Sequence, residues 1–486
     1  MRKRFEQQTQ LGRLLIQDTP ITTAKRTGAL PKLCAALKEI FVTPKWNEKV
    51  FEILEKKILS ANNHTGRRGM DLWQLFVLSQ VRLCQNISYD DLHHVANNDL
   101  LIRQLLGIEA TIGFERPTIS YQNIIDNVGL LHDKTVRELN EIIVDFGHGV
   151  FKKKEEEALR LKTDSFVVES NVHFPTDYNL LWDSARKCLD MIFKLVDKHN
   201  VPGWRKLKNW NSRLKNDMRA LGKACGSGGK GKEERVKKAA ESYLLKANTL
   251  LNKIKKEKPS FAIYSPSDAL ILMELERFMT LLEKHIDLVE RRTLKGETIR
   301  HEEKVFSIFE DYTELIKKGK RSPSVEFGKN TTITTDQYHL IVDYKVMEHT
   351  TDSQIVEELV KSITCKHTVD SWSFDKGFWS PTNKEVLSEN VATVVLPKKG
   401  KCSRVESEEE KRSIFKKLRH RHSAVESNIN ELEHRGLDRC PDKGYEHFKR
   451  YVGLAVGAYN LKKIGERLIE QERKRLSQVQ RRRQAA

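Results

Sequence analysis

Three acidic residues that lie far apart in the sequence are candidates for metal-dependent chemistry. Asp164 lies early in residues 163–172, where alternating and β-branched side chains predict a strand. Asp375 ends a later predicted strand, and Glu426 lies in a predicted helix beside its apolar face. Carboxylates that converge from different elements form the oxygen-rich sites on which two-metal phosphodiester chemistry depends. If the fold brings these residues together, we expect them to hold two Mg²⁺ ions, with Mn²⁺ as a substitute.

The elements that must position these carboxylates follow one another in a defined order. Apart from one long helical block, the pattern predicts three strands, then a helix, a strand, a helix, a strand and two helices. The later strands are predicted at 325–335, 339–347, 369–375 and 391–396. The ribonuclease H-like α/β fold has this order, and its first and fourth strands are neighbours. Asp164 and Asp375 are then expected to share a metal, with Glu426 reaching them from the helix above.

The rest of the chain divides by composition and periodicity. Three prolines, Pro20, Pro31 and Pro44, favour an irregular start, whereas possible caps at Asp71 and Ser88 favour helices after it. Helical spacing also fills much of the chain after the first strand, including about 267–292 and 299–318. The expected parts are an irregular segment at 1–65, an all-helical DNA-binding domain at 66–150, a catalytic core at 160–177 and 322–465, a helical insertion at 178–321, and a basic tail at 466–486.

The charge of the chain indicates a polyanionic partner. Among its 486 residues the formal net charge is +19, and the pI is about 9.4. Such an excess is typical of nucleic-acid binding, although a basic surface without a partner is the simpler alternative. No apolar run is long enough to cross a membrane, and the N-terminus lacks the apolar stretch of a secretory signal. The seven cysteines are widely spaced, so we expect reduced thiols and a cytoplasmic protein.

A basic strip within the helical insertion is a second candidate for nucleic-acid contact. Arg205, Lys206 and Lys208 lie between Trp204 and Trp210. Cations can bind phosphates while aromatic rings stack on unpaired bases. The alternative is a solvated helix face whose tryptophans belong to a helical core. The sequence does not separate these two interpretations.

Several segments together resemble bacterial insertion-sequence transposases of the DDE type, and the resemblance runs over most of the chain. The segments that carry it are Gly66-Arg67-Arg68-Gly69-Met70, Asn86-Ile87-Ser88-Tyr89-Asp90-Asp91-Leu92, Thr163 to Asp177 around Asp164, Val325-Glu326-Phe327-Gly328-Lys329, Asp375-Lys376-Gly377-Phe378, and Arg419 to Glu426. The resemblance gives the three catalytic places to Asp164, Asp375 and Glu426. It implies cleavage at element ends and joining of the 3′-ends to target DNA.

The sequence departs from this family around Glu426. Many relatives carry an Arg four residues before the glutamate and a Lys seven after it, where this chain has His422 and Glu433. The equivalent DNA contacts are therefore expected from Arg419, Arg421 or Arg435. Further candidate DNA contacts are Lys376 and His422 itself.

The resemblance also implies partners and leaves alternatives open. The partner would be double-stranded DNA, both element ends and target, bound by a homodimer or higher oligomer associated with the nucleoid. One alternative is a domesticated DNA-binding protein that no longer cuts. Another is a ribonuclease H-like nuclease that hydrolyses DNA without strand transfer.

Overall fold

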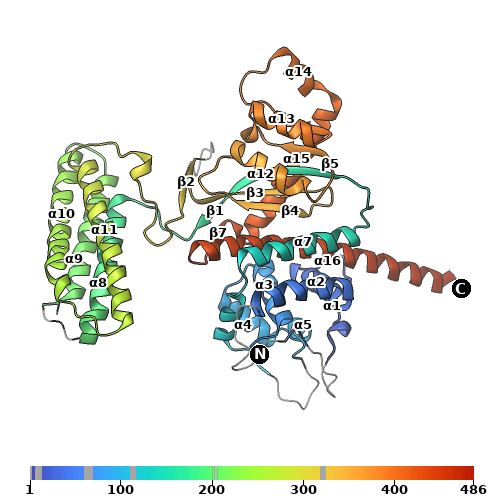
Figure 1. Cartoon of the computed structure of the whole chain (residues 1–486), viewed down its shortest axis with the longest axis horizontal. Helices are drawn as coiled ribbons and strands as arrows, with labels where there is room; N and C mark the ends of the chain where they lie inside the picture. The colour runs from blue at the N-terminus through green and yellow to red at the C-terminus, as the bar shows by residue number, and fades with distance from the viewer. Residues whose placement is uncertain are drawn as a thin grey trace. The chain divides into compact units, whose positions relative to one another are not determined.

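The structure is a computed structural model in which the chain forms two compact units (Figure 1). It describes residues 3–5, 14–59, 69–109, 117–199, 201, 203–204, 206–317 and 325–485. The first unit combines Met1–Asn171 with Ile316–Ala486, and the second is Val172–Leu315. The second unit thus begins directly after the first strand. Within the described ranges, no helix is both long and apolar enough to span a bilayer.

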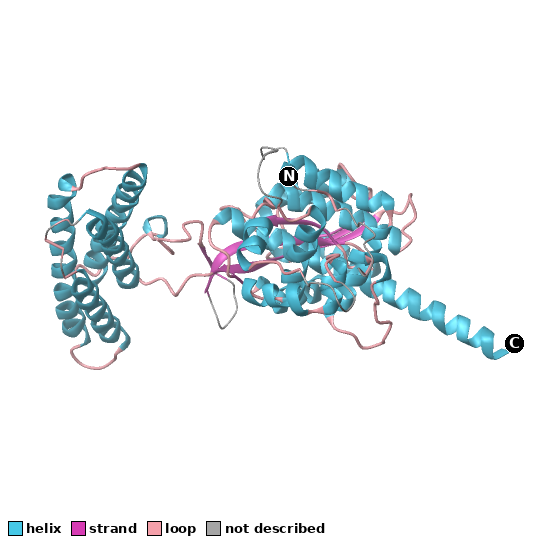
Figure 2. Ribbon diagram, turned by 90° about the horizontal axis from the view of Figure 1, so that it is seen from below, coloured by secondary structure: helices cyan, strands magenta, loops and turns pink. Residues whose placement is uncertain are grey.

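The first unit is built on a mixed seven-stranded sheet, which lies among helices in Figure 2. Its strands are β1 (Leu159–Ser170), β2 (Glu314–Lys317), β3 (Val325–Thr335), β4 (Ile341–Val346), β5 (Val369–Phe374), β6 (Thr393–Val395) and β7 (Arg439–Cys440). The order is β2-β3-β1-β5-β6, with β4 paired to β3 and β7 to β1. β3 is antiparallel to β1 and β4, whereas β5 is parallel to β1 and β6. The chain is therefore a mixed α/β protein with additional helical regions.

Helices cover the two faces of this sheet. α12 (Asp352–Thr364) and α13 (Pro381–Asn390) contribute to an apolar core that includes Leu161 and Trp372. α15 (Ser413–Leu432) lies against the opposite face, where Ser373 of β5 contacts it. α14 (Arg404–Lys411) precedes α15. Successive side chains of a strand point to opposite faces, so Leu161 faces α12 and Lys162 faces α15.

Seven helices before β1 belong to the same compact unit as the sheet. They are α1 (Ala29–Val42), α2 (Pro44–Leu54), α3 (Leu72–Gln85), α4 (Tyr89–Asn98), α5 (Leu100–Leu105), α6 (Tyr121–Val128) and α7 (Asp133–Val150). The C-terminal helix α16 (Tyr445–Ala485) packs against α1, α3, α7 and β4. Two ion pairs add to this packing: His148 Nε2 lies 2.8 Å from Asp336 Oδ2, and Arg82 Nη2 lies 2.6 Å from Asp442 Oδ1.

The N-terminal part differs from the sequence expectation in two ways. Residues 1–65 are not irregular throughout, because α1 and α2 occupy much of this range. Pro44 does not break a helix here, since it starts α2 at the first helical position, where the missing N–H costs nothing. The helices of 66–150 also do not separate as a domain, because the buried face of α16 joins them to the sheet. That join could not be seen from local pattern.

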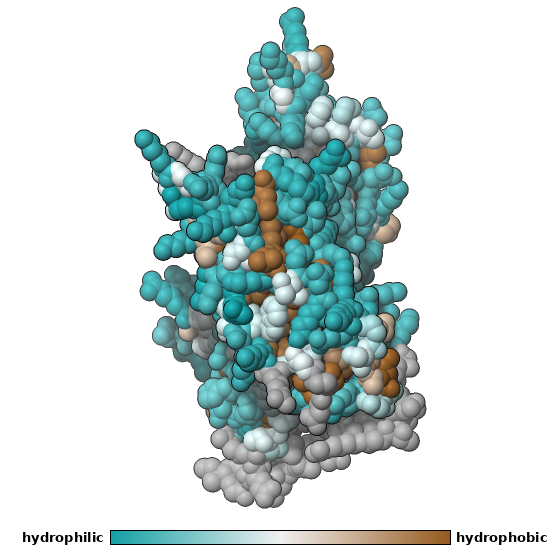
Figure 3. Space-filling model, turned by 90° about the vertical axis from the view of Figure 1, so that its left-hand side faces the viewer, coloured by the Kyte–Doolittle hydropathy of each residue, from teal (hydrophilic) through white to brown (hydrophobic). Residues whose placement is uncertain are grey.

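The second unit is a bundle of four helices. They are α8 (Asp177–His199), α9 (Leu207–Gly226), α10 (Lys232–Glu257) and α11 (Pro266–Thr293). One apolar core includes residues from all four, among them Leu189, Leu214, Tyr243 and Leu282. The face seen in Figure 3 is largely hydrophilic, with a run of hydrophobic side chains near its centre and smaller hydrophobic patches elsewhere. The helix expected at 299–318 is wrong: this stretch holds a short turn, His301–Glu303, and then β2.

The predicted strands after the bundle are confirmed, with small shifts at their ends. The capping box of Thr351 and Gln354 and the cap of Ser88 on α4 are also present. The first strand begins at Leu159, four residues before its predicted start. Asp164 therefore lies in the middle of β1, not early in it. The extra residues are ordered by pairing with β5, a contact that the sequence does not encode locally.

Candidate active site

The pairing of β1 with β5 brings Asp164 and Asp375 together. Lys162 is the partner of Ser373 and Thr163 is the partner of Phe374 in the parallel ladder. Asp375 follows Phe374 directly and caps the short turn η5 (Lys376–Phe378). One residue beyond the last pair, Asp164 and Asp375 therefore stand side by side and point to the face that α15 covers.

Asp164 experiences the negative charge of three other carboxylates. Its pKa is raised to about 7, first by burial and then by the charges of Asp375, Asp352 and Glu426. The backbone N–H of Ser165 donates to Asp164 Oδ1 at 2.8 Å, which opposes the rise in pKa. The charges of Asp375, Asp352 and Glu426 thus all reach Asp164 in the middle of β1.

Glu426 comes to this group from α15, as the sequence predicts for a helix above the sheet. The side of α15 that meets the sheet carries Phe415, Val425 and Ile429, all buried. Glu426 follows Val425 and is exposed at the edge of that buried side. Its charge acts on Asp164. The three carboxylates chosen from the sequence therefore lie around one place in the fold.

Asp352 is a fourth carboxylate that sequence reasoning missed. It is the first residue of α12, and Asn330 Nδ2 of β3 donates to its Oδ1 at 2.9 Å. Gly377 leaves room for it, because a Cβ at Gly377 would lie 2.9 Å from Asp352 Oδ2. The glycine at position 377 thus allows Asp352 to lie close to the backbone just after Asp375. The capping box at Thr351 located this helix start, but nothing in the sequence placed it beside β5.

The electrostatics of this group fit a divalent cation. Within the described part of the chain, Asp164, Asp375 and Glu426 form no ion pair with Lys, Arg or His. Converging carboxylates without a cationic partner are the donor set that Mg²⁺ or Mn²⁺ prefers. Nevertheless, no cluster of three or more His, Cys, Asp or Glu residues is already arranged as metal ligands among the described residues.

His422 does not lie where a DNA contact requires. It is only 9% exposed and lies on the side of α15 that faces the sheet, with Nδ1 3.0 Å from Ser373 Oγ. Burial is the main reason that its pKa is lowered to about 4, so the ring is neutral at pH 7. His422 falls three residues before Val425, on the side of α15 that packs on the sheet. This burial does not favour the DNA contact expected for His422, which instead joins α15 to β5.

The other candidate contacts near the carboxylates are exposed. Arg419, Arg421 and Lys376 all face solvent, and Arg419 lies 3.7 Å from Glu410. Arg435 of the alternative set instead donates to the carbonyl oxygen of Cys84 at 2.7 Å. Arg435 therefore helps to hold the N-terminal helices, whereas Arg419, Arg421 and Lys376 remain accessible to a phosphate backbone.

The basic strip of the bundle has exposed cations, and its two tryptophans belong to the core or pack against it. Trp204 is buried, and Trp210 packs against the bundle core. Their packing matches the simpler interpretation, in which the tryptophans belong to the core. Lys206 and Lys208 are exposed and remain candidates for phosphate contact. Arg205 lies outside the described residues.

Comparisons with known proteins do not place this chain. No protein-family model, no curated protein and no solved structure matches it. The site and its geometry therefore carry the functional argument alone.

Proposed function

We propose that this protein is a DNA transposase of the DDE type, with a ribonuclease H-like catalytic core formed by residues 160–177 and 322–465. The observation that carries this proposal is the convergence of Asp164, Asp375 and Glu426 from three separate elements. Carboxylates that come from separate elements and have no ion-pair partner among the described residues are suited to two-metal phosphodiester chemistry. The net charge of +19 adds a reason to expect a nucleic-acid partner.

The topology supports the ribonuclease H-like part of the proposal. Three strands, β1, β3 and β4, are followed by α12, β5, α13, β6 and later helices. The first and fourth strands of that order, β1 and β5, are parallel neighbours. This is the adjacency expected for a ribonuclease H-like sheet. The bundle between β1 and β3 is then an insertion into that core.

In the proposed reaction the protein would hold the metal ions and orient the DNA, and it would form no covalent bond to the DNA. Asp164 and Asp375 would hold one cation between two strands, and Glu426 would hold a second from α15. Bound there, two Mg²⁺ ions would activate the attacking water or 3′-hydroxyl and stabilise the departing oxygen. The adjacent strands make the Asp164–Asp375 spacing rigid, while α15 sets the position of Glu426. Lys376, Arg419 and Arg421 are exposed and available for the backbone of the bound strand.

The wider assembly is proposed on the same basis. The partner would be double-stranded DNA, as element ends and as target, in a cytoplasmic, nucleoid-associated complex of two or more copies. We assign recognition of the ends to the helices α3–α7 by analogy with the transposases that the sequence resembles, whose catalytic domains themselves read little sequence. A truncation of those helices cannot test this, since α16 packs on them. Substitution of exposed residues on α4 and α6 is the suitable experiment.

A paired assay tests the activity. Full-length protein is incubated with DNA that carries the ends of the element and with a supercoiled target, in Mg²⁺, in Mn²⁺ or in EDTA. Metal-dependent nicking and joined products are expected. Nicking without joining would make the protein a nuclease. Binding with neither activity would make it a non-cutting DNA-binding protein.

A further inference from the structure

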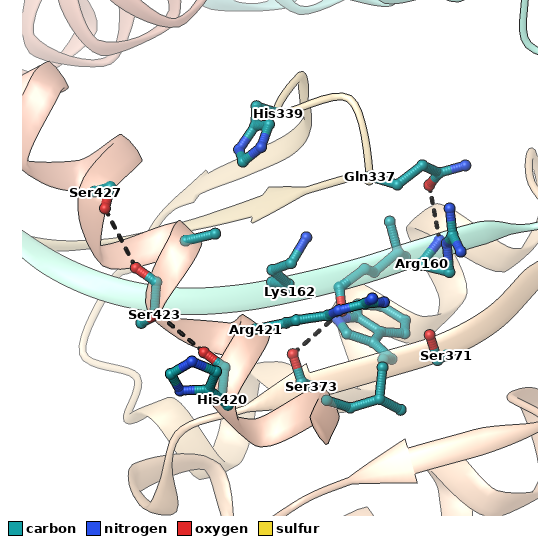
Figure 4. Close-up of a pocket in the computed structure, with 14 residues that line it drawn as sticks. Arg160, Lys162, Gln337, His339, Ser371, Ser373, His420, Arg421, Ser423 and Ser427 are labelled. Carbon is teal, nitrogen blue, oxygen red and sulfur yellow. Dashed lines mark hydrogen bonds between the residues drawn. The ribbon is translucent and has the colours of Figure 1, made fainter. Parts of the chain in front are cut away.

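A basic cavity lies beside α15 and apart from the carboxylates (Figure 4). It is formed by β1, β5, the turn before β4, and α15, and its volume is about 570 Å³. Arg160, Lys162 and Arg421 are among its lining residues, and no Asp or Glu is. Asp164, Asp375 and Glu426 do not line it either. The cavity is therefore a separate site on the same face of the sheet.

The cations of this cavity have no close ion-pair partner among the described residues, although the charge of Arg160 acts on Glu157 and that of Asp336 acts on Lys162. Across the described ranges, Arg160, Lys162 and Arg421 (the cation trio) form no ion pair. Lys162 Nζ donates to the carbonyl oxygen of Asp336 at 3.3 Å, but the carboxylate of Asp336 is bound by His148 instead. Three cations around one concave surface that no Asp or Glu lines produce a positive potential that attracts anions.

The neutral groups of the cavity suit an oxyanion. Ser423 and Ser427 lie one turn apart on α15, and both hydroxyls donate to backbone carbonyls of the same helix. Their oxygens lie beside the cavity, as Figure 4 shows for both residues, together with Gln337 and His339 of the turn before β4. The amide of Gln337 and the imidazole of His339 can donate to phosphate oxygens, whereas the two serine hydroxyls would first have to turn from their carbonyl partners. The space exceeds that of one small ion and is open at its surface.

We infer that this cavity binds the phosphodiester backbone of a nucleic acid, with the cation trio as its phosphate contacts. This inference rests on the proposed function for the identity of the anion. The cavity shares α15 with Glu426, so a strand held along α15 would reach both the cavity and the carboxylates. The protein would then contact further phosphates of the DNA besides the one that reacts.

Salt-dependent DNA binding tests the inference without cleavage. The triple variant Arg160→Gln, Lys162→Gln and Arg421→Gln is compared with full-length wild type in EDTA by fluorescence anisotropy on a labelled duplex. Each phosphate contact contributes about 0.9 to the slope of log affinity against log salt. Loss of three contacts should lower that slope by about 2.7 and weaken binding at low salt.

The matched control removes the same charge from cations that already have partners. Lys345, Lys361 and Arg404 pair with Glu358, Glu357 and Glu408. Changing these three to Gln should leave the salt slope within about 0.5 of wild type. An equal fall in both triple variants would overturn the inference, because it would reflect net charge alone. An unchanged slope in the cavity variant would overturn it as well.

Protection of Lys162 in wild-type protein gives a second readout that needs no variant. Reductive methylation followed by mass spectrometry should show Lys162 protected by duplex DNA, while Lys361 stays reactive. Protection by pyrophosphate but not by DNA would assign the cavity to a small phosphate ligand and reject the nucleic acid. If Asp164→Asn protein keeps the protection, the site is independent of catalysis. A protein without cleavage activity that still shows this protection would contradict the proposed function and leave the cavity site standing.

Discussion

Asp164 of β1 and Asp375 after β5 lie next to each other on parallel neighbouring strands, one residue beyond the paired Thr163 and Phe374. Two carboxylates at this spacing repel each other unless a cation or a proton lies between them. Burial is the main cause of the raised pKa of Asp164, and the charge of Asp375 adds to it. The predictions below start from this pair.

Neutralising Asp164 should stabilise the protein when divalent cations are absent. Its folded pKa of about 7 exceeds the ordinary value near 3.9, so the folded state holds this proton more tightly. The free energy of unfolding therefore falls as pH rises from about 4 to about 7, because Asp164 loses its proton less readily in the folded state than in the unfolded state. At pH 8 in EDTA, Asp164→Asn should have a higher melting temperature than wild type, and its free energy of unfolding should be larger by on the order of 2 kcal/mol. At pH 5 the difference should be much smaller. Added Mg²⁺ should raise the melting temperature of wild type only. Equal melting of the two proteins at pH 8 would contradict the carboxylate repulsion.

Replacing single carboxylates should separate ligands from neighbours. Asp164→Asn, Asp375→Asn and Glu426→Gln keep the side-chain shape but remove the charge that holds a cation. Each should lower the cleavage rate by at least about 100-fold while DNA binding in EDTA stays near wild type. Asp352→Asn should lower the cleavage rate by about 10–100-fold, as expected for a residue that positions metal ligands and is not itself a ligand. A variant of Asp164 that cuts at the wild-type rate would remove it from the site.

The buried His422 should affect stability and not phosphate contact. His422→Ala removes the hydrogen bond to Ser373 and leaves a cavity, so it should destabilise by about 1–3 kcal/mol. Since the pKa of His422 is lowered to about 4, stability from this neutral ring is lost as pH falls from about 6.5 to 4. His422→Gln should leave the salt slope of DNA binding unchanged, whereas Arg421→Gln should lower it by about one. A reversed result would place His422 against DNA.

Filling the space beside Gly377 should displace Asp352. In Gly377→Ala the new methyl would meet Asp352 Oδ2 at 2.9 Å, so this carboxylate must rotate or move away. Cleavage should fall by about 3–30-fold with little change in melting temperature, because the obstructing atom ends a flexible side chain. Gly228→Ala, where nothing lies within 4 Å, is the control and should keep full activity. Wild-type activity of Gly377→Ala would show that Asp352 needs no fixed position.

The exposed lysines of the bundle should contribute to DNA affinity. Lys206→Ala with Lys208→Ala should lower the salt slope by up to about 1.8 if both cations contact phosphates. Trp210→Phe, which keeps most of the core packing, should leave the slope unchanged, because Trp210 packs against the core. Titration of the double variant at several salt concentrations measures this. An unchanged affinity and slope would make these lysines ordinary solvated side chains.

Local patterns in the sequence were sufficient to predict most of the strands. They also assigned Asp164 and Glu426 to the correct type of element and Asp375 to the end of a strand. Alternating residues mark β3, β4, β5 and β6, and the periodicity of α15 predicts Glu426 beside an apolar face. Such signals are readable because each depends on residues within one element. The helical character of most of the stretch between the first strand and β3 was also visible, since helical spacing continues there for more than a hundred residues.

Only the tertiary structure decided which side chains meet. Asp352 joins the carboxylates through the packing of α12 beside β5, and His422 is buried because α15 turns that side toward Ser373. The cation trio likewise comes from β1 and α15, which are more than two hundred residues apart. The union of the N-terminal helices with the sheet depends on α16 at the other end of the chain. Contacts between distant segments are set by the packing of whole faces, and no local pattern records which face will find which partner.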